Sequence, residues 1–140
     1  MVTQFSVFLT NKVGKLFDLV ECFDGSQTRI CAISVHEASD HAVVRLITSS
    51  AQQAAKILQA ENLPYSVREV LVVELGGGHT LSSMCLSLLS AELSIHFAYP
   101  LMTRPEGGPV MALAVDDLTL AGQILRRKEF RLLGEADLCQ

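Results

Sequence analysis

The sequence predicts an α+β fold built from two copies of one small βαββαβ unit. The first observation is an internal repeat, because the segment at 54–58 (Ala-Ala-Lys-Ile-Leu) returns about 67 residues later at 121–125 (Ala-Gly-Gln-Ile-Leu). A second pair of segments, 5–16 and 70–81, keeps nearly the same offset and has the same strand, turn and helix start. Two copies in 140 residues leave about half of the length for each.

The composition is that of a globular chain with a large core. Hydrophobic residues make up 49% of the sequence and charged residues 19%, which favours packing over disorder. The net charge of −4 argues against nucleic acid as a partner, because phosphate selects basic surfaces. No stretch approaches the ~20 apolar residues of a membrane span. We therefore expect a cytoplasmic protein, without a membrane partner or a signal peptide.

The first copy alternates strands and helices in a readable order. A strand at 4–10 leads through the turn at 11–14 into a helix with apolar residues at helical spacing. Two further strands, 29–36 and 41–48, are joined so closely that they must be antiparallel. Ser49-Ser50 then provides a cap for an alanine-rich helix at 51–59, and a long strand at 65–75 follows.

The second copy repeats this order and begins with the end of that long strand. A glycine-rich turn at 76–79 precedes a helix at 80–90, for which the pattern predicts that Leu81, Met84, Cys85, Leu88 and Leu89 face the core. Strands are expected at 93–99 and 109–115, a helix at 118–127 and a final strand within 130–137. A long connection at 100–108, rich in proline and glycine, separates the two middle strands.

This order is the ferredoxin-like one, in which a four-stranded antiparallel sheet carries two helices on one face. The boundary between the copies falls inside the long strand. We therefore expect a first unit over residues 1–69 and a second over 70–140, packed side by side.

The strand-to-helix turn of each copy is the candidate ligand site. Glycine lets a ligand approach the backbone, and the free amides at a helix N-terminus suit a carboxylate such as that of an amino acid. A glycine that serves only the turn is the competing interpretation. The residues predicted to contact a ligand are Asn11, Val13, Gly14, Lys15 and Leu16 in the first copy, and Gly77, Gly78 and His79 in the second.

Other residue clusters have plainer explanations. His36, Asp40 and His41 could share a metal, but their spacing is more typical of a solvated hairpin. The cations at 126–128 fit a helix C-terminus better than a phosphate site. The glycines at 76–78 lack the Gly-Lys-Ser/Thr of a phosphate loop. Four cysteines without a Cys-x-x-Cys pair indicate reduced thiols, and two of them, Cys22 and Cys85, are expected in the core.

With these elements and turns established, the chain resembles a tandem pair of ACT domains over about residues 3–137. The family has an Asn-x-x-Gly-x-Leu turn into its first helix, and residues 11–16 (Asn-Lys-Val-Gly-Lys-Leu) match it. Val13 stands where the family usually has proline. The second turn, 76–81, keeps the leucine and a nearby glycine but has no asparagine.

The resemblance implies a regulatory module that binds a small molecule, an amino acid, without catalysis or a cofactor of its own. It implies a ligand held between the first turn of one unit and the second strand of a neighbour, near residues 94–96 or 33–34. A homodimer and an enzyme regulated in trans are the expected partners. A structural or interaction protein with degenerate sites is the first alternative, and a small enzyme on this scaffold is the second.

The two copies are expected to bind unequally. The second turn has three glycines and few side chains that could select a ligand, whereas the first keeps Asn11. We therefore predict that the first turn is the more selective of the two sites.

Overall fold

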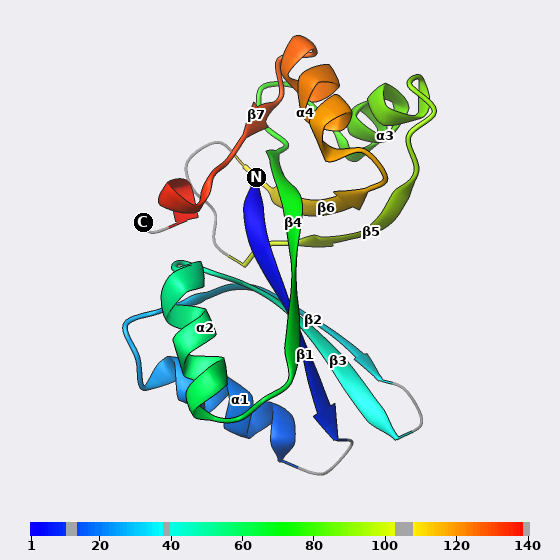
Figure 1. Ribbon diagram of the computed structural model, residues 1–140. Coiled ribbons are helices and arrows are strands. Elements are labelled where there is room, and N and C mark those ends of the chain that lie inside the picture. The colour runs from blue at the N-terminus through cyan, green and yellow to red at the C-terminus, as the bar shows by residue number, and fades with distance from the viewer. Residues whose placement is uncertain (11–13, 38–39, 103–107, 139–140) are drawn as a thin grey trace. The chain divides into compact units, whose positions relative to one another are not determined.

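The computed structural model describes residues 1–10, 14–37, 40–102 and 108–138, and these form two compact units (Figure 1). The N-terminal unit comprises Thr3–Arg68, and the C-terminal unit comprises Glu69–Leu138 together with Met1–Val2. Both have the βαββαβ order, so the predicted α+β class with two ferredoxin-like units is confirmed. The strand β4 (Tyr65–Glu74) gives its first residues to one unit and its remaining residues to the other.

In the N-terminal unit, two helices cover one face of the sheet (Figure 1). The sheet has the order β2-β3-β1-β4, and β3 pairs antiparallel with both β1 and β2. Besides β4, its elements are β1 (Val2–Thr10), α1 (Lys15–Asp24), β2 (Ile30–Glu37), β3 (His41–Thr48) and α2 (Ala51–Ala60).

Alternation along β1 builds the core of the N-terminal unit. Phe5, Val7 and Leu9 are buried on the face that meets the helices. Leu19 and Phe23 of α1 close on them, four residues apart and therefore on one side of the helix. Leu16, three residues before Leu19 and so expected by helical spacing on the same side, is instead 39% exposed at the start of the helix.

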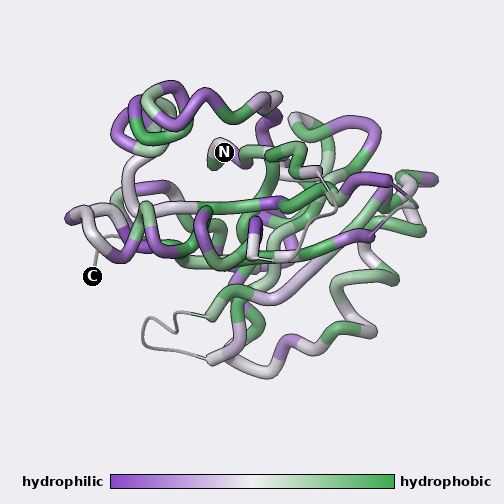
Figure 2. Tube along the Cα trace, turned by 90° about the horizontal axis from the view of Figure 1, so that it is seen from below, coloured by the Kyte–Doolittle hydropathy of each residue, from purple (hydrophilic) through white to green (hydrophobic). Residues whose placement is uncertain are grey.

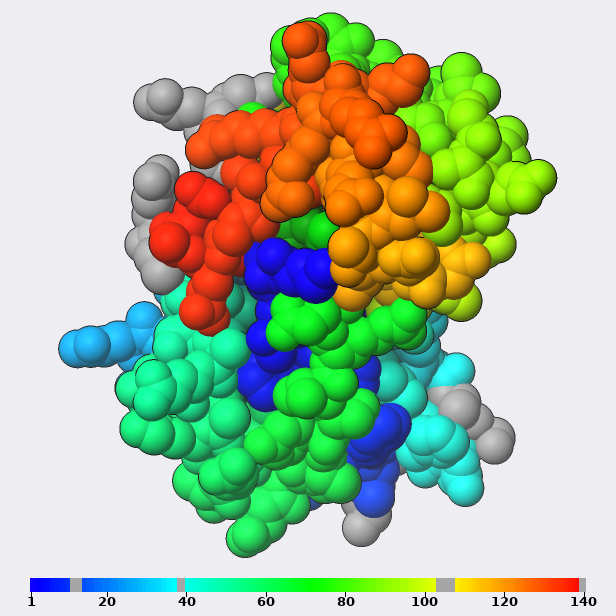
Figure 3. Space-filling view, turned by 45° about the horizontal axis from the view of Figure 1, so that its top comes forward, coloured from blue at the N-terminus to red at the C-terminus, as the bar shows by residue number. Residues whose placement is uncertain are grey.

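In the C-terminal unit the sheet has the order β7-β4-β6-β5, and its neighbouring strands are antiparallel. The helices α3 and α4 lie next to each other on one face of it (Figures 1 and 3). Besides β4, the elements are α3 (Leu81–Leu89), β5 (Ile95–Pro100), β6 (Val110–Val115), α4 (Leu118–Arg127), β7 (Arg131–Leu132) and the 3₁₀ helix η1 (Glu135–Leu138).

Helix α3 differs from its prediction in the face that it buries. Met84 and Leu88 are buried, as expected, but Leu81 and Leu89 are 52% and 69% exposed and Cys85 is exposed as well. The helix carries no charged residue, so it stays green to pale in Figure 2, and its apolar pattern extends round most of the circumference. Periodicity therefore could not select the buried side.

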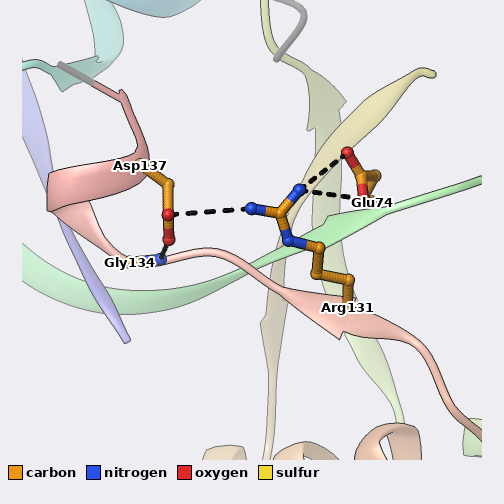
Figure 4. A network of polar contacts seen from close by, with 4 residues as sticks. All are labelled: Glu74, Arg131, Gly134 and Asp137. Atoms are coloured by element: carbon orange, nitrogen blue, oxygen red, sulfur yellow. Dashed lines mark hydrogen bonds and ion pairs between the residues drawn. The ribbon is translucent and has the colours of Figure 1, made fainter. Parts of the chain in front are cut away.

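The segment 131–138 is held by a polar network and is mostly not the final strand that the sequence predicted within 130–137. Strand β7 has two residues, after which η1 begins. The guanidinium of Arg131 lies 3.4 Å from Glu74 Oε2 and 3.8 Å from Asp137 Oδ1, and Gly134 N donates to Asp137 Oδ2 (Figure 4). Buried Leu133 and Leu138 fix the same segment to the core.

Within the described part of the chain, no helix has the length and apolar character needed to cross a membrane.

Candidate functional site

The first strand-to-helix turn of the repeat opens into α1 at Gly14. This residue has φ +90°, a left-handed conformation that glycine adopts without strain. Gly14, Lys15 and Leu16 are all exposed there. Asn11 and Val13, the other two predicted ligand contacts of this turn, lie outside the described residues.

Helix α1 differs from the other three α-helices in how the backbone amides of its first turn are hydrogen-bonded. A side chain caps each of the others: Ser50 accepts from the amide of Gln53, Thr80 from that of Ser83, and Asp117 from that of Leu120. Among the described residues no side chain caps α1. No described side chain therefore competes with an anion for these amides, and the helix dipole favours an anion at this end.

A cavity of about 240 Å³ lies at this turn, between the end of β1, the start of α1 and the paired strands β2 and β3. The strand register explains its floor, because Leu9 pairs with Ala42 and Ala42 pairs with Glu37 across the sheet. The next lining row pairs Val44 with Val35. The cavity is lined by Leu9, Thr10, Lys15, Leu16, Val35, Glu37, Ala42 and Val44.

Two side chains of opposite charge line this apolar cavity. Lys15 is the only cation and Glu37 the only anion among the described lining residues. A molecule with a carboxylate, an ammonium group and an apolar side chain would find a partner for each part here. Sequence reasoning missed Glu37 because it assigned the residue to the polar connection after the strand. The alternation of β2 carried the signal, since residues 33, 35 and 37 share one face.

The second turn is arranged differently. Gly77 and Gly78 have φ values of +63° and +91°, so both are left-handed. His79 stacks on Phe130 with 3.8 Å between ring centroids, and its Nε2 lies 3.1 Å from the carbonyl oxygen of Glu129. The imidazole, which was predicted to meet a ligand, thus contacts the turn after α4.

A capping box occupies the start of the following helix. Thr80 Oγ1 accepts from the amide of Ser83, and Ser83 Oγ accepts in turn from the amide of Thr80. Side chains of the helix itself thus satisfy amides that an incoming carboxylate would otherwise bind.

The hairpin histidines make local contacts. His36 Nε2 lies 2.8 Å from the guanidinium of Arg45, and His41 Nδ1 lies 2.7 Å from Asp40 Oδ1. The hydrogen bond from His41, followed by its charge, lowers the pKa of the Asp40 carboxyl below its usual range. Within the described residues no group of three His, Cys, Asp or Glu side chains is placed to hold a metal ion.

Comparison with solved structures agrees with this fold. The chain is similar to protein BT0572 from Bacteroides thetaiotaomicron, with a TM-score of 0.88 and 21% identity, covering 99% of this chain and 96% of that one. It is also similar to the regulatory subunit of aspartate kinase from Thermus thermophilus in its ligand-free form. That match has a TM-score of 0.61 and 13% identity, and covers 89% and 90% of the two chains.

A search of curated proteins found no match. The family model for the ACT domain pair, by contrast, matches residues 1–140, the whole of the sequence. This match confirms the resemblance drawn from the duplicated unit and its first turn. The chain therefore belongs to the ACT domain pair family.

Proposed function

We propose that this chain is a regulatory module that binds an apolar α-amino acid at the first turn of the repeat and has no catalytic activity of its own. The start of α1, which no described side chain caps, lies beside a cavity lined by both Lys15 and Glu37, and this arrangement carries the proposal. The ligand carboxylate would lie against the amides after Gly14 and near the Lys15 ammonium. Its ammonium group would face Glu37, and its side chain would rest on the apolar floor.

The family supports the regulatory part of this proposal. The chain belongs to the ACT domain pair family, and a solved structure that shares its fold is the regulatory subunit of an aspartate kinase. In this proposal, binding of the amino acid changes the activity of an enzyme regulated in trans. We propose a homodimer as the working form, as the sequence already led us to expect.

The second turn enters the proposal as the weaker site. The capping box of Thr80 and Ser83 bonds the amides of these two residues, and His79 is engaged with Phe130 and Glu129. Gly77 and Gly78 remain as the backbone that a ligand could approach. We therefore expect one tightly bound amino acid per chain.

An interaction protein without a ligand is the second candidate, and one observation favours it. Leu81, Leu86 and Leu89 of α3 are each more than half exposed, which is unusual for leucine on one helix. A partner that covers this face would explain it. Light scattering with the wild type and with Leu86→Ser/Leu89→Ser would show whether an assembly depends on these side chains.

Titration calorimetry with the full chain tests the amino-acid site. We expect saturable binding of leucine, valine or isoleucine with one site per chain. At one hundred times the dissociation constant, the bound amino acid should stabilise the fold by about 2.7 kcal/mol in a thermal shift experiment. Lys15→Gln should weaken binding by about tenfold or more, because a charge-assisted contact is lost.

A matched pair of ligands isolates the role of Glu37. Glu37→Gln should weaken the binding of leucine but leave 4-methylpentanoate, which lacks the ammonium group, nearly unaffected. Lys56→Gln, an exposed lysine of α2, is the charge control and should bind like the wild type. No heat with any amino acid, or equal effects of Lys15→Gln and Lys56→Gln, would contradict the proposal.

A further inference from the structure

A second cavity, of about 220 Å³, lies between the C-terminal halves of α3 and α4. It is formed entirely by the C-terminal unit, and it shares no residue with the cavity at Gly14. It is lined by Ser87, Ser90, Ala91, Ile124, Arg127 and Lys128. It therefore combines two cations, two hydroxyl groups and a small apolar surface.

The two cations are not used by the fold around them. Within the described residues neither Arg127 nor Lys128 has a carboxylate oxygen within 4.0 Å. They are not needed to cap α4 either, because backbone amides already satisfy its last carbonyl groups. Lys128 N donates to Ile124 O, Glu129 N to Arg126 O and Phe130 N to Leu125 O. The helix dipole favours cations at this end, but it does not account for the hydroxyl groups beside them.

The two serines present acceptors rather than donors to the cavity. Ser87 Oγ donates its proton to the carbonyl of Ser83, and Ser90 Oγ donates to that of Leu86, each at 2.8 Å. A hydroxyl oxygen whose proton is committed keeps its lone pairs for an incoming donor. An anion without hydroxyl groups could not donate a hydrogen bond to these oxygens, whereas a ligand with hydroxyl groups could.

We propose that this cavity binds a small hydroxylated phosphate monoester of sugar-phosphate size. Arg127 and Lys128 would hold the phosphate, with the guanidinium able to donate two parallel hydrogen bonds. The ligand hydroxyl groups would donate to Ser87 and Ser90, and the carbon face of the sugar would lie against Ala91 and Ile124. The volume lies below the ~300 Å³ at which pockets for drug-sized ligands begin, and this favours a sugar phosphate over a larger nucleotide.

The probe for the test is ribose 5-phosphate, titrated into the full chain at physiological salt. Binding should be saturable with one site per chain. Inorganic phosphate has only the anionic group and ribose only the hydroxyl groups. Each should therefore bind at least about tenfold more weakly than ribose 5-phosphate. Amide chemical shift changes should centre on Ser87, Ala91 and Ile124.

The chain provides a matched control on the same helix end. The Arg126 guanidinium lies back over α4, 3.8 Å from the point where a Cβ on Gly122 would stand, and it does not line the cavity. Arg127→Gln should weaken ribose 5-phosphate binding by about tenfold or more, whereas Arg126→Gln should stay within about threefold. Ser87→Ala should weaken ribose 5-phosphate but not inorganic phosphate.

Three outcomes would overturn the proposal. The first is no saturable binding of ribose 5-phosphate at millimolar concentration. The second is an equal loss in Arg126→Gln and Arg127→Gln, which would indicate a diffuse effect of positive charge. The third is inorganic phosphate binding as tightly as the sugar phosphate, since the cavity would then recognise an anion only.

Discussion

The imidazole of His79 stacks on the ring of Phe130, with 3.8 Å between the centroids and 20° between the ring planes. The same imidazole reaches the carbonyl of Glu129, a residue with φ +66°. The turn before α3 is thereby tied to the turn after α4. His79, which the sequence predicted to contact a ligand, thus has a structural partner in the C-terminal unit.

Substitution of His79 should therefore lower stability. We expect His79→Ala to reduce the free energy of unfolding by about 1–2 kcal/mol, from the lost ring contact and hydrogen bond. His79→Phe should recover the stacking part. Urea denaturation followed by circular dichroism measures both. His96→Ala, at an exposed position of β5, is the control and should stay within about 0.5 kcal/mol of the wild type. Equal effects at the two histidines would show that the stack contributes nothing.

Two glycines at opposite ends of α1 provide a matched test of backbone strain. An added Cβ at Gly14 would meet no atom within 4 Å among the described residues, so Gly14→Ala should cost only the left-handed strain, about 1 kcal/mol. Gly25 has φ −78°, and its added Cβ would lie 3.7 Å from Glu21 O, an ordinary contact. Gly25→Ala should therefore be neutral or slightly stabilising. Thermal unfolding separates the two outcomes, and a larger cost at Gly25 would contradict this account.

The thiols should differ in reactivity. Burial, followed by the charge of the Glu61 carboxylate and a hydrogen bond to it, raises the pKa of the Cys22 thiol above its usual value. Because the thiolate is the reactive form, Cys22 should react more slowly with iodoacetamide at pH 8 than exposed Cys85. The difference should shrink as the pH rises toward the pKa of Cys22. Peptide mapping by mass spectrometry reads both sites in one sample, and faster labelling of Cys22 would contradict the prediction.

Glu61→Gln tests the cause of that shift. Removing the carboxylate should lower the pKa of Cys22 and speed its alkylation, while leaving the rate at Cys85 unchanged. Buried Cys31 should remain the slowest of these three thiols in both proteins.

The fold was predictable because local patterns and the repeat agreed. Alternation in the strands and the cap at Ser50 located most elements to within a few residues. The wrong buried face of α3 has a physical cause. Every position of this helix is apolar or serine, so Leu81 and Leu89 gave no signal about which side meets the sheet.

The site was only partly predictable for a different reason. Gly14 and Lys15 could be identified from a turn motif, since the motif is local in sequence. The alternation of β2 indicates only which face Glu37 lies on, whereas its place in line with Ala42 and Leu9 depends on β-sheet register, which the alternation does not specify. The engagement of His79 with Phe130 joins residues about 50 apart and depends likewise on tertiary packing.

The polar network at the end of β4 provides the last prediction (Figure 4). The side chain of Glu74 is 8% exposed and that of Arg131 is 54% exposed. The carboxylate therefore has little access to water and needs the guanidinium as its charge partner, whereas the guanidinium is largely solvated. Arg131→Gln should therefore destabilise the chain by about 1–3 kcal/mol, because a buried charge loses its partner. Glu74→Gln, which removes that charge, should cost less.

A double-mutant cycle separates this effect from general damage. Once Glu74 is neutral, Arg131→Gln should add little, which gives a coupling of about 1 kcal/mol or more between the two residues. Asp137→Asn is the control, because its contact with Arg131 is longer, at 3.8 Å, and the amide oxygen can still accept from Gly134. It should change stability by less than about 1 kcal/mol. Additive effects of Glu74→Gln and Arg131→Gln would mean that the ion pair does not stabilise the C-terminal segment.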